Sequence, residues 1–224
     1  MIAVASVFYA DGAAKTRGQM MAVSQSTRTG LYDPALDHDS CGIGFVADIK
    51  GRPSHQIITQ GQTVLTNLTH RGAVGADPLA GDGAGMLIQI PDSFFRAEAG
   101  SLGIDLPEPG HYGVSMVFLP QDETYRAVCA EIVEEAVLAE GLQLLGWRDV
   151  PVDSTCLGES VKPLEPVIRQ VFVGRGNTIS DTDAFERKLF VARKQAHHAI
   201  RKRAPHIISR GTYYIPSMSA RTIT

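Results

Sequence analysis

The chain has 224 residues, a length that suits one large domain or two small ones. Its 44% hydrophobic and 20% charged residues are typical of an ordinary soluble globular protein. The net charge of -3 is too small for the electrostatic footprint of a nucleic-acid-binding protein. No apolar run approaches the length of a membrane-spanning helix. We therefore expect no nucleic acid and no membrane among the partners.

The first forty residues are rich in Ala, Ser, Thr, Gly and Asp and show little periodicity. This composition predicts a leader rather than a core element over residues 1–40. Residues 2–10 faintly resemble the apolar region of a signal peptide, but no positively charged region precedes them. Because Met20 and Met21 follow, residues 1–19 are also open to interpretation as an upstream extension of the true start.

The chain has three cysteines, Cys41, Cys129 and Cys156. An odd number without regular spacing argues against a disulfide scaffold, so we expect a cytoplasmic location. No CxxC or HxxxH pair suggests a zinc site, and we expect no bound metal.

The ordered elements begin at Cys41. An apolar run predicts a strand over 41–49, and a helical repeat predicts an amphipathic helix over 57–68 that ends near His70. A glycine-rich loop over 81–85 follows. Further on, the pattern predicts strands and one helix in this order: strand 86–90, strand 112–119, helix 122–140, strand 143–150 and strand 168–173.

The clearest helix is predicted over 182–202. Ser180 or Asp181 is a candidate N-cap, and Lys202 with Arg203 suits the C-terminal end. An extended segment begins at 213 and continues into the last residues, so we expect a chain that is cut short. Several strands with helices in two groups predict layered sheets with helices outside them, an α+β fold.

Cys41 is the first candidate for chemistry. Removal of the leader after Ser40 would give Cys41 a free α-amino group, whose reference pKa of about 7.7–8.0 is close to working pH. That amine could take the thiol proton, so one residue would supply both nucleophile and base. The alternative is an inert buried cysteine, which is the usual fate of a lone Cys.

Three other features have competing interpretations. The His-Arg-Gly run that includes Arg71 suits a helix C-terminus as well as a site. The glycine-rich loop precedes a strand rather than a helix, which disfavours a dinucleotide site. Arg221 could hold a carboxylate through two parallel hydrogen bonds, or it could be a surface arginine.

Five blocks of the sequence together resemble the class II glutamine amidotransferase domain of glutamate synthase large subunits. The resemblance covers residues 41–224, and the blocks occur in the order of that family. They are Cys41-Gly-Ile-Gly-Phe45, His70-Arg-Gly-Ala73, Gly81-Asp-Gly-Ala-Gly85, Gly146-Trp-Arg-Asp-Val-Pro151 and Ser219-Ala-Arg-Thr222.

The resemblance implies an N-terminal-nucleophile hydrolase fold, four αββα layers with two stacked antiparallel sheets. It implies that residues 1–40 are a propeptide and that 41–224 form the amidotransferase domain, incomplete at its C-terminal end. Cys41 would attack the side-chain amide of L-glutamine and form a thioester that water hydrolyses to glutamate. The ammonia would aminate 2-oxoglutarate in a downstream synthase domain of the same chain.

The family pattern also implies roles for individual residues. Arg71 would support the Cys41 end of the pocket, and Arg221 would hold the substrate α-carboxylate with Thr222 beside it. Asp82 and Gly83 match a family motif without an assigned role.

Other parts of the family machinery lie outside this sequence. The Asn-Gly oxyanion pair and a later Asp follow the Arg-Thr motif, so we expect this segment alone to be inactive or nearly so. FMN and a 3Fe-4S iron–sulfur cluster are expected in the full-length protein, not in these residues. A small NAD(P)H-oxidising flavoprotein subunit is a further candidate partner.

Two other functions stay open at this point. One is another class II amidotransferase, such as one making asparagine, glucosamine phosphate or phosphoribosylamine. The 146–151 block and the long stretch between His70 and Arg221 favour glutamate synthase over these. The other is a non-catalytic module that binds glutamine or a partner.

Overall fold

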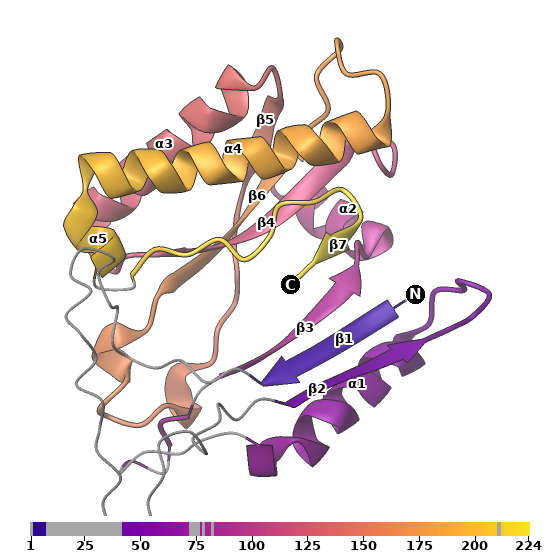
Figure 1. The fold of residues 1–224 in the computed structure, drawn as a ribbon, viewed down its shortest axis with the longest axis vertical. Coiled ribbons are helices and arrows are strands. Elements are labelled where there is room, and N and C mark those ends of the chain that lie inside the picture. Colours follow the sequence, from indigo (N-terminus) through magenta and orange to yellow (C-terminus); the bar gives the residue numbers. More distant parts are fainter. Residues whose placement is uncertain (1, 8–41, 72–76, 78, 82, 210–211) are drawn as a thin grey trace, which may run out of the picture.

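A computed structural model describes residues 2–7, 42–71, 77, 79–81, 83–209 and 212–224. Two antiparallel sheets with helices packed against them make an α+β fold (Figure 1), as predicted. The strands of the four-stranded sheet, in spatial order, are β2 (Gly42–Ala47), β1 (Ile2–Val7), β3 (Ala84–Gln89) and β7 (Thr222–Ile223). Those of the three-stranded sheet are β4 (Tyr112–Leu119), β6 (Val167–Gly174) and β5 (Gln143–Asp149).

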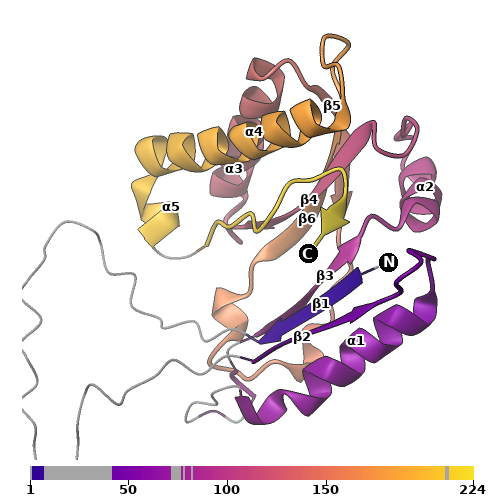
Figure 2. The same ribbon diagram turned by 45° about the vertical axis from the view of Figure 1, so that its right-hand side comes forward.

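Helices cover the outer sides of both sheets (Figure 2). The first helix lies against the four-stranded sheet, and the third and fourth lie against the three-stranded sheet. The α-helices are α1 (His55–Asn67), α2 (Asp92–Ser101), α3 (Glu123–Ala139), α4 (Thr182–Arg203) and α5 (Pro205–Ser209). Short 3-10 helices are η2 (Thr69–Arg71), η3 (Ser154–Cys156) and η4 (Lys162–Leu164).

The central strand β6 joins the two apolar clusters. Val171 and Val173 pack into the cluster formed with α3 and α4. Phe172, between them, points to the opposite face and meets Phe95 of α2 edge to face, with ring centroids 5.5 Å apart. Ile223 of β7 belongs to this second cluster, so the two sheets share apolar contacts there. Successive side chains of β6 therefore point to opposite faces of the three-stranded sheet and pack into both apolar clusters.

Helix α4 matches its sequence prediction closely. The Asp181 side chain accepts a hydrogen bond from the backbone N–H of Ala184 at 2.7 Å, which makes Asp181 the N-cap. Basic residues occupy the last turn, where they favour the helix dipole. Helix α2, which the sequence analysis did not predict, has only two buried residues, Phe95 and Ala99, and Pro91 provides no side-chain cap. Its periodic signal is correspondingly short.

Strand β1 differs from the prediction of a leader without a core element. Residues Ile2–Val7 pair antiparallel with β2 on one side and with β3 on the other. β-branched residues at positions 2, 4 and 7 favour a strand, and the same apolar character produced the faint resemblance to a signal peptide. Within the described part of the chain, no helix is long and apolar enough to cross a membrane.

Gly44, in the middle of β2, allows α1 to lie directly on the strand. A Cβ atom added at Gly44 would stand 2.5 Å from Cγ1 of Val64, in the last turns of α1. Valine is stiff about χ1, so the clash could be relieved only by moving the helix away from the sheet.

We predict that Gly44→Ala lowers the free energy of unfolding by about 1–3 kcal/mol, because overpacking forces the helix and sheet apart. Urea denaturation measures this change. Gly85→Ala in β3 is the matched control: its added Cβ meets nothing within 4 Å, so we expect no loss and a gain of up to about 1 kcal/mol. Equal losses in both variants would contradict this interpretation of Gly44.

Candidate active site

The residues predicted to carry chemistry are only partly covered by the structure. Cys41 and Asp82 lie outside the described residues. Gly42, directly after Cys41, begins β2, and Gly83, directly after Asp82, precedes β3. Gly83 has φ of +90°, a conformation that favours glycine. Arg71 ends the 3-10 helix that follows α1.

The structure brings three of these positions to one end of the four-stranded sheet. Val7 pairs with Gly42 on one side and with Ala84 on the other, so β2 and β3 both start there. Because Gly44 lies under Val64, near the C-terminal end of α1, the segment leading to Arg71 leaves the helix at this end too. The backbone therefore brings the flanks of Cys41 and Asp82 to one end of the sheet, toward which α1 also ends before Arg71.

The Arg221–Thr222 motif lies at the other end of β3. Thr222 pairs with Gln89, and the backbone N–H of Ile90 donates to the carbonyl oxygen of Arg221 at 3.0 Å. The six residues of β3 separate its two ends by about 17 Å. The described residues thus do not place Arg221 and Thr222 beside Gly42 and Gly83.

The segment before β7 is held close to the three-stranded sheet. Ser219 and Val114 exchange two backbone hydrogen bonds, of 2.9 and 3.2 Å. A Cβ atom at the neighbouring Gly113 would stand 3.2 Å from the carbonyl group of Ser219 and 2.7 Å from Leu189. The absence of a side chain at Gly113 therefore permits this approach.

Two carboxylates of α4 contact the same segment. Glu186 accepts hydrogen bonds from Ser219 and Ala220, and Asp183 forms a salt bridge with the guanidinium of Arg221. Sequence reasoning missed both acids. They flank the apolar face of a helix at positions where charged residues are ordinarily solvated, and periodicity carries no signal of their partners.

The Gly146–Pro151 block, one of those that support the family resemblance, has a packing role. The Trp147 indole N–H donates to Glu134 of α3 at 2.8 Å. The largely buried Arg148 donates to Glu98 of α2 and to Gln170 of β6, with nitrogen–oxygen distances of 2.5–3.0 Å to the two partners. These contacts tie β5 to its neighbours, so we assign the block to the architecture and not to the chemistry.

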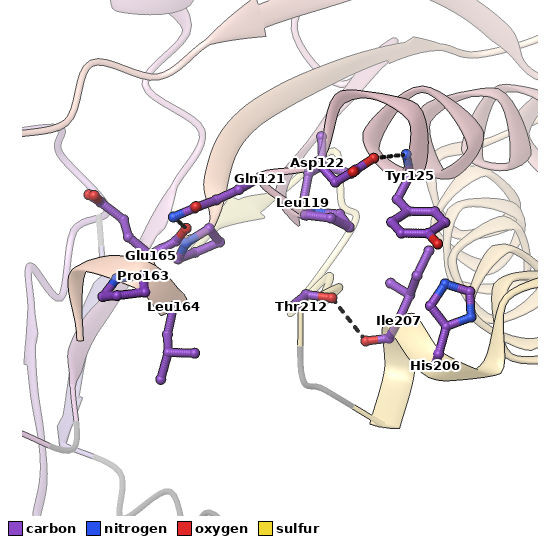
Figure 3. A pocket seen from close by; sticks show the side chains of 12 residues that line it. Leu119, Gln121, Asp122, Tyr125, Pro163, Leu164, Glu165, His206, Ile207 and Thr212 are labelled. Carbon is purple, nitrogen blue, oxygen red and sulfur yellow. Dashed lines mark hydrogen bonds between the residues drawn. The ribbon is translucent and has the colours of Figure 1, made fainter. Parts of the chain in front are cut away.

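A pocket with a volume of about 220 Å³ lies between α3, η4 and α5 (Figure 3). Its polar groups already serve local structure: Asp122 caps α3, Gln121 donates to carbonyls of Lys162 and Glu165, and Thr212 donates to Ile207. The predicted site residues are not among those that line it. We therefore do not assign the chemistry to this pocket.

The two described cysteines are free thiols in opposite environments. Cys129 is fully buried in α3, as the helical pattern predicted, and burial raises the pKa of its thiol to about 11. Cys156 is exposed at the end of η3. Since the thiolate is the reactive form, the two should differ sharply in reactivity.

We expect iodoacetamide at pH 7 to alkylate Cys156 in the folded protein and to leave Cys129 unmodified. Peptide mapping after a timed reaction distinguishes the two sites, and Cys156→Ser should remove the adduct assigned to Cys156. Denaturant should expose Cys129 to the reagent. Rapid alkylation of Cys129 in the folded state would show that α3 is not packed as described.

Comparison with known proteins identifies the family of this chain. Residues 41–224 match the family model of class-II glutamine amidotransferases. The chain belongs to this family. The matched region starts at Cys41, the residue that the sequence analysis selected as nucleophile.

The similar proteins are glutamate synthases. The chain is 44% identical over 195 residues to the "Glutamate synthase [NADPH] large chain" of Bacillus subtilis, covering 87% of this chain and 12% of that protein. It is 41% identical over 199 residues to the "Glutamate synthase [NADH]" of Schizosaccharomyces pombe, covering 86% and 9%. A "Ferredoxin-dependent glutamate synthase 1" of Arabidopsis thaliana is 38% identical over 170 residues, covering 76% and 10%. The chain thus spans about a tenth of the length of these relatives.

Proposed function

We propose that this chain is the glutamine-hydrolysing part of a glutamate synthase, with Cys41 as its nucleophile. The observation that carries the proposal is the start of the family match at Cys41 itself. The identity to glutamate synthases favours this enzyme over the other class II amidotransferases. In the complete protein, the ammonia released here aminates 2-oxoglutarate.

The reaction follows from an N-terminal cysteine. Removal of residues 1–40 as a propeptide frees the α-amino group of Cys41, which takes the thiol proton directly or through a water. The thiolate attacks the side-chain amide carbon of L-glutamine. The carbon–nitrogen bond breaks, the α-ammonium returns its proton to the departing ammonia, and water then hydrolyses the thioester to glutamate and the free thiol.

The fold proposed for this chemistry is the four-layer arrangement of N-terminal-nucleophile hydrolases. Its support is the order of α1, the four-stranded sheet, the three-stranded sheet, and α3 with α4 (Figure 2). The apolar cluster of Phe95, Tyr112, Phe172 and Ile223 provides the contact between the sheets. Residues 41–224 would form this domain.

In the mature site, Arg221 holds the substrate α-carboxylate with Thr222 beside it, and Arg71 supports the Cys41 end. Arg221 lies about 17 Å along β3 from the start of that strand, farther than one glutamine molecule reaches. Strand β1 lies between β2 and β3 in this form. We therefore assign the described arrangement to the precursor, and removal of the propeptide withdraws β1 from the sheet.

The cofactors of the proposed full-length enzyme do not fit these residues. An iron–sulfur cluster of the 3Fe-4S kind is held by several cysteine thiolates. Of the three cysteines here, Cys41 is the nucleophile, Cys129 is buried within α3 and Cys156 lies on the surface. We place the cluster, FMN and the contacts with a small NAD(P)H-oxidising flavoprotein subunit outside residues 1–224, in a cytoplasmic enzyme.

Intact mass spectrometry tests the proposal. We expect the purified full-length protein to start at Cys41 and to gain one adduct from an electrophilic, diazoketone analogue of glutamine, because only the activated thiolate reacts at stoichiometric reagent. Excess L-glutamine should protect against the adduct.

Two variants serve as controls. Cys41→Ser should gain no adduct, whereas Cys156→Ser should react like the parent protein, which excludes labelling of the exposed thiol. A protein that keeps residues 1–40 and takes no adduct at Cys41 would refute the proposed function.

A further inference from the structure

Helix α4 presents two acids, one turn apart, to the segment that precedes β7. Glu186 is half-buried and faces the backbone of this segment, whereas Asp183 is exposed and faces the side chain of Arg221. The two carboxylates therefore bind different parts of the same segment. One holds the main chain of the motif and the other holds its guanidinium.

Glu186 organises the main chain through Ser219. Its carboxylate accepts the backbone N–H of Ala220 at 2.7 Å and the hydroxyl of Ser219 at 3.0 Å. The Ser219 hydroxyl oxygen in turn accepts the backbone N–H groups of Arg221 at 3.0 Å and Thr222 at 3.3 Å. A single ionised group thus satisfies, directly or through one hydroxyl, three consecutive N–H groups of the motif. Hydrogen bonds to an ionised acceptor are the stronger kind.

Asp183 pairs with Arg221 in a geometry open to solvent. The side chains are 70% and 57% exposed, so this ion pair contributes little to stability. An incoming carboxylate can reach the guanidinium there and replace Asp183 with a ligand of the same charge and shape. Both groups are accessible, and the exchange needs no opening of the core.

We propose that Glu186 is the positioning residue of the carboxylate-binding motif and that Asp183 is an internal competitor, which occupies Arg221 until the α-carboxylate of an amino-acid ligand displaces it. This inference rests on the proposed role of Arg221 as the α-carboxylate ligand. It adds a selectivity device to that role, because a ligand without a carboxylate cannot take the place of Asp183 on Arg221.

The two acids have opposite expected effects on affinity. Removing the charge of Asp183 frees Arg221, so Asp183→Asn should bind L-glutamate about two- to fivefold more tightly, the range of an exposed ion pair. Removing the charge of Glu186 loosens the backbone of Arg221 and Thr222, so Glu186→Gln should bind L-glutamate at least about tenfold more weakly.

Isothermal titration calorimetry of the processed protein measures these effects. L-glutamate is the product of the proposed reaction and is not turned over. L-isoglutamine has a neutral amide in place of the α-carboxylate and keeps only the γ-carboxylate, so Asp183→Asn should raise its affinity less than that for L-glutamate. Glu131→Gln, an exposed glutamate on α3, is the matched control for loss of a carboxylate and should alter neither ligand.

Amide hydrogen exchange gives a readout that does not depend on any ligand. In Glu186→Gln, the backbone N–H groups of Ala220, Arg221 and Thr222 should exchange faster, while unfolding midpoints stay close to those of the parent. Unchanged exchange at Ala220 would refute the positioning role of Glu186. Equal changes for L-glutamate and L-isoglutamine in Asp183→Asn would refute the competition.

The outcomes also separate this inference from the proposed function. A protein that takes the electrophile at Cys41 but binds L-glutamate and L-isoglutamine equally well refutes the present inference and leaves glutamine hydrolysis in place. A protein without the Cys41 adduct refutes glutamine hydrolysis, and the exchange rate of Ala220 then still decides the role of Glu186.

Discussion

Burial of β6 on both faces is the constraint on which the rest of the described structure depends. Gln170 to Gly174 is buried throughout, with alternate side chains directed to opposite clusters. One face supports the long helix α4, and the other supports α2 and the strands of the second sheet. A change of register by one residue would exchange Val171 and Phe172 between clusters of different shape, so the pairing of β6 with both neighbours is strongly specified.

The position of α4 on that face determines the site. Phe185 and Leu189 anchor the helix in the core, and this leaves Asp183 and Glu186 on its flank beside the Arg221 segment. The helix cannot rotate without unburying its apolar face, so the two acids are kept beside this segment. The apolar packing of α4 therefore determines which charged side chains lie beside the Arg221 segment.

The four-stranded sheet relates the leader to the proposed chemistry. The end of β1 lies between the starts of β2 and β3, which begin one residue after Cys41 and two residues after Asp82. In this form the sheet is complete only with a strand from residues 1–40. Maturation by cleavage before Cys41 would thus be both a chemical step, which frees an amine, and a structural one, which removes a strand.

The sequence by itself determined the family, the nucleophile candidate and most of the elements. Five sequence motifs in the order of a known family identify that family without any knowledge of the structure. A long apolar stripe such as that of α4 predicts a helix with one buried face. Tertiary structure alone decided that Ile2–Val7 is a strand and that Arg221 lies away from Gly83. It also revealed that Glu186 accepts hydrogen bonds from Ser219 and Ala220, directly before Arg221. Strand pairing and the contacts of the α4 carboxylates join residues that are far apart in the chain. The free energy of these interactions depends on distances in space, which neither composition nor periodicity encodes.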